Sequence, residues 1–342
     1  MSILIVGGGK MGLSHMAILN RLLDKGEIGL CDSSWLARYM FSKLQIRTFR
    51  SLDKALQNPS QWRGAIVATP TPSHFAISKS LLERSIPCFI EKPLTLNPVQ
   101  SELLAALQSR SGTIVQMGLV ARFIQSFVRL RRIAKTGFLG APLNYRARML
   151  GNVVTKPGNY GWRTDFSRGG GCLNEYGPHL LDLCRSIFGD VKVLQSVSFG
   201  RVHSSLADDN VKISWKHASG AQGDLLLDWC DNSRRKSSID FEVVFEQGTV
   251  RANDAGLSIQ AKQRGDFDPI LHGEFTGPPL PYPVNFYLRG EEYSLQLEVF
   301  LERVLGKNLL RANIGHDLAA SIADGLEIDR LIKNIAAIGH LS

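Results

Sequence analysis

The first candidate for a catalytic site is the stretch Glu91-Lys92-Pro93. It follows an apolar run, so it lies at the carboxyl end of a predicted strand, the edge at which open parallel sheets bind ligands. A lysine there can donate a hydrogen bond to a substrate oxygen and stabilise negative charge that develops on it. An ordinary salt-bridged pair on a surface loop accounts for the same residues, so both interpretations stay open.

A second candidate runs from Gly169 to Asp182 and begins with three glycines, which let a backbone lie close to a ligand. Glu175 and His179 are four residues apart, so on a helix they share a face. A carboxylate beside an imidazole selects its tautomer and raises its pKa, which suits a proton carrier. Pro178 leaves open whether the helix begins before it or at it. A capping segment with a structural histidine is the alternative, but the glycines and the acid favour catalysis.

The third stretch opens the chain, where a short apolar run leads into the glycine loop Gly7–Gly12. A helical pattern and a second apolar run that ends on Asp32 follow. This order of strand, glycine loop, helix, strand and acid is typical of a dinucleotide site. Gly7 permits the tight turn, Gly9 lets the backbone approach a pyrophosphate, and Gly12 lets the helix pack close to the strand.

The acid indicates the type of nucleotide. Asp32 follows the loop by about the twenty residues expected of an acid that binds ribose hydroxyls, and it would repel a 2′-phosphate. NAD(H) is therefore favoured over NADP(H), although Arg38 keeps the phosphorylated form open. Thr69–His74 follows another predicted strand and suits a wall beside the nicotinamide ribose, with Ser73 as a candidate N-cap. We predict that the cofactor is bound by Gly7, Gly9, Lys10, Met11, Gly12, Asp32, Thr69, Pro70, Thr71, His74, Glu91 and Lys92.

The composition is that of a globular protein with room for two domains. The 342 residues are 44% hydrophobic, and no apolar run reaches the length of a membrane span. Five scattered cysteines without a CxxC pair argue against a disulfide framework or a zinc site and favour a reducing cytoplasm. The net charge of +9 fits a solvated surface or attraction of an anionic cofactor and substrate. The basic clusters are too short for a nucleic-acid module, so we expect neither nucleic acid nor membrane as partner, and no metal.

The elements that must position these residues follow two patterns. In the first part, apolar runs alternate with helical patterns, which indicates an open parallel sheet with right-handed crossovers. Further on, Ile239–Phe245 and Lys212–Lys216 alternate between apolar and polar residues, which is typical of an antiparallel sheet covered on one face. We expect hairpin turns at Ser219-Gly220 and Gln247-Gly248, a loop over Asp266–Pro283, and closing helices near Glu291–Leu305 and Gly315–Ile338.

Together these motifs and their spacing resemble the Gfo/Idh/MocA family of NAD(P)-dependent oxidoreductases. The resemblance rests on the glycine loop, Ala68–His74, Glu91–Pro93, Gly118–Phe123 and Gly169–Asp182. It implies an α/β fold with a Rossmann domain, residues 1–118, whose parallel sheet is doubly wound. An α+β domain for substrate binding and oligomerisation, residues 119–342, follows and has a large, mostly antiparallel sheet. Oligomers through that sheet are common in the family, so we expect a homodimer or homotetramer.

The resemblance also implies roles. Lys92 would contact the reacting oxygen, His179 would transfer the proton, Glu175 would orient His179, and Lys92–Pro93 would be a cis peptide. Two departures matter: Glu175 stands where aspartate is usual, and Val120–Phe123 keeps one arginine of a segment that is commonly Asn-Arg-Arg-Phe-like. The residues that would bind substrate are Lys92, Arg122, Trp162, Arg163, Glu175 and His179.

The activity so implied is NAD(H)-dependent interconversion of a secondary hydroxyl and a ketone. The substrate would be a sugar, cyclitol or nucleotide-linked sugar, a small molecule that can be anionic. Two alternatives of the same fold are an NAD-dependent glycosidase with a transient redox cycle and a non-catalytic NAD-sensing regulator. The presence of Lys92 and His179 argues against the regulator.

Overall fold

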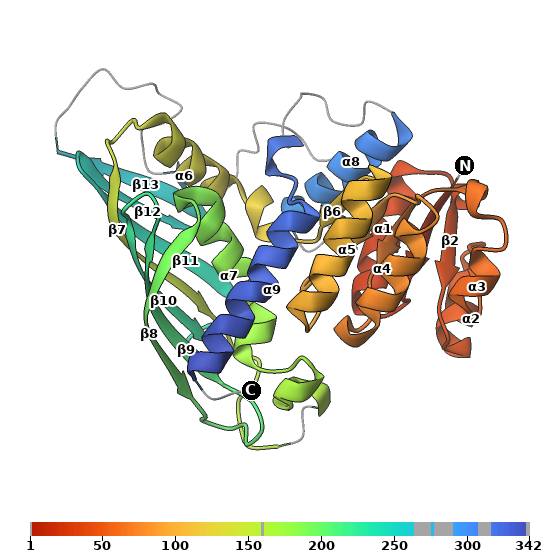
Figure 1. Cartoon of the computed structure of the whole chain (residues 1–342), viewed down its shortest axis with the longest axis horizontal. Helices are drawn as coiled ribbons and strands as arrows, with labels where there is room; N and C mark the ends of the chain where they lie inside the picture. The colour runs from red at the N-terminus through yellow and green to blue at the C-terminus, as the bar shows by residue number, and fades with distance from the viewer. Residues whose placement is uncertain (1, 159–160, 263–274, 277–289, 307–315, 340–342) are drawn as a thin grey trace. The chain divides into compact units, whose positions relative to one another are not determined.

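A computed structural model describes residues 2–158, 161–262, 275–276, 290–306 and 316–339 (Figure 1). The chain divides into two compact units. One contains the chain to Phe123, helix α8 (Glu291–Leu305) and the chain that follows up to Arg330; the other contains the sheet-forming residues from Ile124 and the chain from Leu331. Among the described helices, none is long and apolar enough to cross a membrane.

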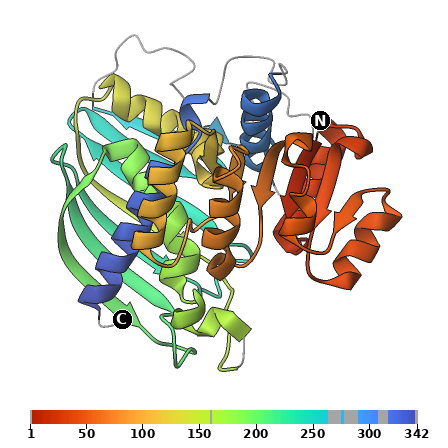
Figure 2. The ribbon, with the colours of Figure 1, turned by 45° about the vertical axis from the view of Figure 1, so that its right-hand side comes forward.

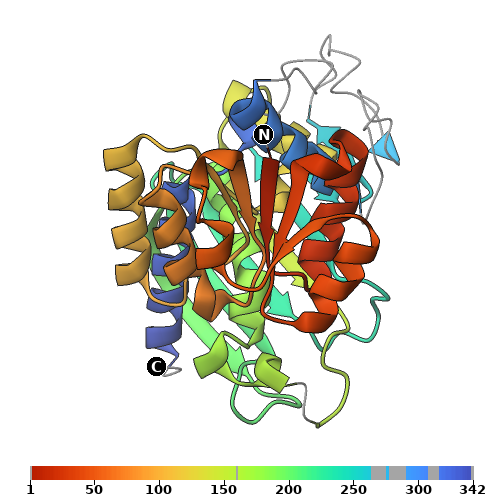
Figure 3. The same cartoon turned by 90° about the vertical axis from the view of Figure 1, so that its right-hand side faces the viewer.

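The first unit is a parallel sheet with the strand order β3-β2-β1-β4-β5-β6 in the described chain. Apolar side chains project from both faces of this sheet, so helices cover both faces, as Figure 3 shows. Helices α4 and α5 pack on one face, and α1 and α8 pack on the other. The strands are β1 (Ser2–Val6), β2 (Ile28–Cys31), β3 (Arg47–Phe49), β4 (Trp62–Val67), β5 (Cys88–Ile90) and β6 (Val115–Met117). The other helices are α1 (Lys10–Leu22), α2 (Trp35–Lys43), α3 (Leu52–Ala55), α4 (His74–Leu82), α5 (Pro98–Ser111) and the start of α9 (Ile322–Ile338).

The second unit is a mostly antiparallel sheet, with the order β14-β13-β12-β11-β7-β10-β9-β8 in the described residues. Only the β7–β10 pair among the pairings described is parallel. Helices α6 (Gln125–Thr136) and α7 (Cys172–Phe188) pack against one face of the sheet (Figure 2). The strands are β7 (Pro142–Leu150), β8 (Val191–Gly200), β9 (Asn210–His217), β10 (Gln222–Asp228), β11 (Ser238–Phe245), β12 (Gly248–Asn253), β13 (Gly256–Ala261) and β14 (Phe275–Thr276).

The predicted fold class is confirmed, including the alternating burial along β11 and the helix Glu291–Leu305. The compact units are discontinuous in sequence, whereas we predicted two continuous domains that meet at residue 118. Ser73 occupies the N-cap position of α4, as predicted, but its side chain makes no capping hydrogen bond: its Oγ lies 2.7 Å from Thr69 Oγ1 and from the Pro70 carbonyl oxygen, within a 3-10 turn. The loop expected over Asp266–Pro283 lies outside the described residues except at β14, which is a strand.

Candidate active site

The glycine loop combines close packing with open space. Gly7 adopts a φ of +102°, which favours glycine, and a Cβ on Gly12 would lie 1.8 Å from the Gly7 carbonyl oxygen. A Cβ on Gly9 would meet no described protein atom within 4 Å. Since Gly9 also precedes the first turn of α1, this space adjoins backbone N–H groups at the positive end of a helix. The loop therefore fits a nucleotide pyrophosphate.

Asp32 closes the other side of this loop. Its Oδ2 accepts a hydrogen bond from the Gly8 N–H at 2.6 Å, and its Oδ1 accepts one from the Ser34 N–H at 2.7 Å. Each carboxylate oxygen has a further lone pair, so both can still accept hydrogen bonds from ribose hydroxyls. Arg38 donates to the Asp32 and Ser33 carbonyl oxygens, 2.7 Å each, and so lies beside the acid.

His74 lies between two loops of the first unit. Its Nδ1 is 2.9 Å from the Pro93 carbonyl oxygen, and its Nε2 is 2.8 Å from the Thr69 carbonyl oxygen. The side chain is buried, and burial lowers its pKa, although the two backbone contacts raise it. We therefore infer that His74 holds the loops at Thr69 and Pro93 together, instead of contacting the cofactor as predicted.

Glu91 is buried beneath the loop that carries Lys92. His15, from α1, approaches it at 2.7 Å between Nε2 and Oε1, and the Lys92 N–H donates to Oε2. Burial alone would raise the pKa of Glu91, but the hydrogen bond and charge of His15 and the charge of Lys92 hold it below its usual value. His15 is not among the predicted site residues; the only sign of it in the sequence is a histidine among the apolar positions of the helix after the glycine loop. Lys92–Pro93 is cis, as the resemblance implies.

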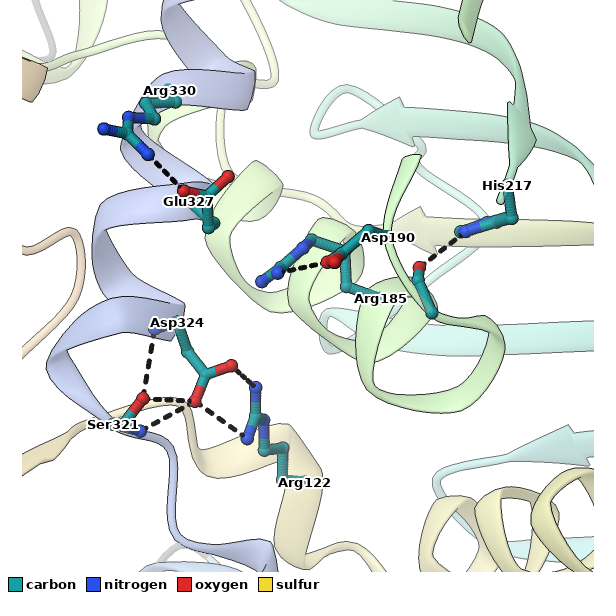
Figure 4. A network of polar contacts seen from close by, with 9 residues as sticks. Arg122, Arg185, Asp190, His217, Ser321, Asp324, Glu327 and Arg330 are labelled. Atoms are coloured by element: carbon teal, nitrogen blue, oxygen red, sulfur yellow. Dashed lines mark hydrogen bonds and ion pairs between the residues drawn. The ribbon is translucent and has the colours of Figure 1, made fainter. Parts of the chain in front are cut away.

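Arg122 is buried and ion-paired within the first unit. Its Nη2 lies 3.0 Å from Asp324 Oδ1, near the start of α9 (Figure 4). Asp324 also accepts hydrogen bonds from the N–H and Oγ of Ser321. Burial opposes ionisation of Asp324, but Arg122 and Ser321 keep its pKa below the usual value. The pair thus holds the segment Val120–Phe123 against the start of α9.

In the second unit, two of the three glycines before α7 lie against other parts of the chain itself. A Cβ on Gly170 would lie 2.3 Å from both the Trp162 and Arg163 carbonyl oxygens, and one on Gly171 would lie 2.2 Å from Asp208 Oδ1. The predicted role of this triplet, close approach to a ligand, is therefore replaced by close approach of the protein's own loop. That loop brings Trp162 and Arg163 to the start of α7, with the Arg163 guanidinium 4.9 Å from the Trp162 ring centre.

Helix α7 resolves the question left open by Pro178. The helix begins at Cys172, so Pro178 lies inside it, and Glu175 and His179 are one turn apart on the same side. Asp208 fixes the start of the helix, because its Oδ2 accepts a hydrogen bond from the Leu173 N–H at 2.7 Å. Burial raises the pKa of Asp208 to about 6, against the lowering effect of that hydrogen bond.

The structure thus places the predicted residues in two groups. The first unit contains the glycine loop, Asp32, Thr69, Glu91, Lys92 and Arg122, and the second contains Trp162, Arg163, Glu175 and His179. At the far end of α7, Arg185 pairs with Asp190, and His217 contacts the Gly189 carbonyl oxygen, as Figure 4 shows. In the described residues, no cluster of three or more His, Cys, Asp or Glu side chains could hold a metal ion.

Comparison with known proteins identifies both halves. Residues 1–119 match the model of an oxidoreductase family with an NAD-binding Rossmann fold, and residues 127–251 match the GFO/IDH/MocA C-terminal domain. A putative UDP-kanosamine synthase oxidoreductase subunit from Amycolatopsis mediterranei is 27% identical over 80% of this chain and 77% of its own. An inositol 2-dehydrogenase from Cereibacter sphaeroides is 25% identical over 72% of each.

Solved structures share the fold. A levoglucosan dehydrogenase in complex with NADH and levoglucosan superposes with a TM-score of 0.80 at 17% identity, covering 99% of this chain and 97% of the other. The loop that fits a pyrophosphate and the acid beside it lie within the matched NAD-binding domain. The chain belongs to the Gfo/Idh/MocA family of oxidoreductases and is an NAD-dependent oxidoreductase.

Proposed function

We propose that this oxidoreductase interconverts a secondary hydroxyl and a ketone on a sugar, cyclitol or nucleotide-linked sugar. The relatives support this class, since their names refer to inositol, levoglucosan and a UDP-linked sugar. The net charge of +9 suits an anionic cofactor and, in the nucleotide-linked case, an anionic substrate. We expect the enzyme to act in the cytoplasm as a homodimer or homotetramer.

The observation that carries the proposal is the arrangement on α7. Glu175 and His179 lie one turn apart on a helix that is continuous from Cys172. A carboxylate at this spacing orients an imidazole and stabilises the imidazolium that forms when it takes up a proton. The imidazole is therefore a stronger base, which is what a proton acceptor for an alcohol needs. The start of the helix is fixed by Asp208, so the pair is presented by a rigid element.

Each residue has one task in the proposed reaction. In the oxidative direction His179 accepts the hydroxyl proton, Glu175 orients His179, and the Lys92 ammonium stabilises the negative charge that develops on the oxygen. NAD, when bound, supplies the hydride acceptor. Trp162 and Arg163 contact the substrate, and the remaining pocket residue, Arg122, acts by holding its segment to Asp324.

The test is an assay of sugars, cyclitols and nucleotide sugars for NADH formation by the native protein, followed by two variants on the best substrate. Lys92→Met and His179→Ala should each lower kcat at least about 100-fold, the usual contribution of a positioned acid–base or charge-stabilising group. NAD affinity, followed by fluorescence, should stay within about threefold for His179→Ala, which lies outside the NAD-binding domain.

The outcome also separates the alternatives. Full turnover by both variants would refute the assignment of catalytic residues. Release of sugar without net NADH would indicate the glycosidase. NAD binding together with a protein partner, and turnover of no substrate in the panel, would indicate the regulator.

A further inference from the structure

Asp329, on α9, is a buried carboxylate that the proposed reaction does not use. Its side chain is 4% exposed. Oδ2 accepts hydrogen bonds from the Thr95 N–H at 2.8 Å and from Ser101 Oγ at 2.6 Å, while Thr95 Oγ1 lies 3.4 Å away. Oδ1 is buried and has no hydrogen-bond partner among the described residues. All three residues belong to the first unit.

A carboxylate is a costly group at such a position. Burial raises the pKa of Asp329 to about 7, even though the hydrogen bonds from Ser101 and Thr95 lower it. An apolar side chain would fill the space without this desolvation cost. Charged groups also lie nearby on the same helices, at the surface. There Arg330 pairs with both Glu102 and Glu327. The Asp329 carboxylate thus lies within hydrogen-bond distance of an amide N–H and two hydroxyls, all of them uncharged groups.

Those contacts fix the far end of the loop that carries Lys92. Thr95 follows Lys92 by three residues, and its Oγ1 donates to the Asn97 carbonyl oxygen, so it also orders the approach to α5. The same loop is held at Glu91 by His15 and at the Pro93 carbonyl oxygen by His74. The backbone around Lys92 is therefore held from three elements: α1, α4 and α9.

We propose that Asp329 is a positioning residue for Lys92: by holding Thr95 and Ser101 it fixes the loop in which the lysine is presented to substrate. The inference rests on the proposed function of Lys92. Preorganisation of this kind matters because an error of about 1 Å in a reacting group can cost about 100-fold in rate. Asp329 itself touches neither substrate nor cofactor.

Two variants test the assignment on the best substrate from the panel. Asp329→Leu removes the acceptor, and we expect kcat per folded molecule to fall at least about 10-fold, with NAD affinity unchanged within about twofold. Asp329→Asn keeps an oxygen that can accept from the Thr95 N–H, so at neutral pH kcat should stay within about threefold of the native value. Native kcat in Asp329→Leu would overturn the proposal.

The pH profile gives a readout that a merely structural role would not move. The ratio of native kcat to that of Asp329→Asn should be near one below pH 6 and rise as the pH passes 7. Only the native carboxylate becomes charged over this range, and a charged acceptor makes stronger hydrogen bonds to Thr95 and Ser101. The proposed catalytic residues are the same in both proteins, so any pH dependence that they cause cancels in the ratio. A flat ratio would overturn the proposal, and this comparison decides alone if Asp329→Leu does not fold.

Asp254→Asn is the matched control. Asp254 is a buried carboxyl of the second unit whose pKa burial raises to about 6, and it accepts a hydrogen bond from the Ile239 N–H. This variant should leave kcat unchanged and give a flat ratio. Lys92→Met, measured in parallel, separates the two levels of the argument: its full activity refutes the proposed function, whereas its inactivity beside native turnover in Asp329→Leu refutes only the positioning role.

Discussion

Two glycine triplets, Gly7–Gly9 and Gly169–Gly171, look alike in sequence and do opposite things in the structure. Beside Gly9 there is no described protein atom within 4 Å of where a side chain would begin. Beside Gly170 two backbone carbonyl oxygens lie at 2.3 Å. The first triplet leaves room for a ligand at Gly9, whereas at Gly170 the second is filled by the protein's own loop, which brings Trp162 and Arg163 to the start of α7. A glycine triplet therefore predicts close approach, but the approaching group must be identified from the fold.

The sharpest test of this contrast is Gly170→Ala. Its new methyl group would meet backbone atoms of Trp162 and Arg163 that cannot rotate away. We expect the free energy of unfolding of the second unit to fall by about 3 kcal/mol, the upper end of the usual range for overpacking. NAD affinity should be unchanged. Thermal unfolding with and without NAD measures both quantities, and a native melting temperature would show that the loop is not packed on the triplet.

A smaller effect on stability is expected from the titration of Asp208, which lies against Gly171 of the same triplet. Its folded pKa of about 6 exceeds the ordinary aspartate value of 3.8, so the stabilisation from its bound proton is complete below about pH 4 and lost as the pH rises through 6. Relative to Asp208→Asn, the native protein should lose about 2–3 kcal/mol of stability between pH 4 and pH 7. Denaturant unfolding of both proteins across this range is the measurement, and parallel curves would contradict the shift.

The smallest effect on stability is expected at Gly9, in the first triplet. Gly9→Ala should leave stability within about 0.5 kcal/mol, since the added methyl group meets no described atom. It should weaken NAD binding at least about 10-fold, or about 1.4 kcal/mol, because the methyl group occupies the approach of the pyrophosphate. Titration calorimetry with NAD decides the matter, and native affinity in this variant would place the cofactor elsewhere.

The sequence was informative where the signal is local. The glycine loop, the alternation of strand and helix and the helix that carries Glu175 and His179 each depend on neighbouring residues, and the structure contains all three. Ser73 is the N-cap residue of α4, but its side chain does not cap the helix, because a 3-10 turn precedes α4 and the hydroxyl contacts Thr69 and Pro70, which come earlier in the chain.

The contacts that hold the site residues in place could not be predicted in the same way. His15 and Glu91 are 76 residues apart, Leu173 and Asp208 are 35 apart, and Thr95 and Asp329 are 234 apart. Each is a buried polar contact set by tertiary packing, and a single sequence contains no periodic pattern that pairs such residues. The discontinuous first unit has the same origin, because α8 packs on the early strands through Leu297 and Phe300.

The most direct test of the central claim is the stoichiometry of NADH and product on a substrate from the sugar and cyclitol panel. The enzyme, incubated with excess NAD and a limiting amount of that substrate, should form one NADH, followed by its absorbance, for each ketone detected by mass spectrometry. Consumption of substrate without net NADH would contradict the account.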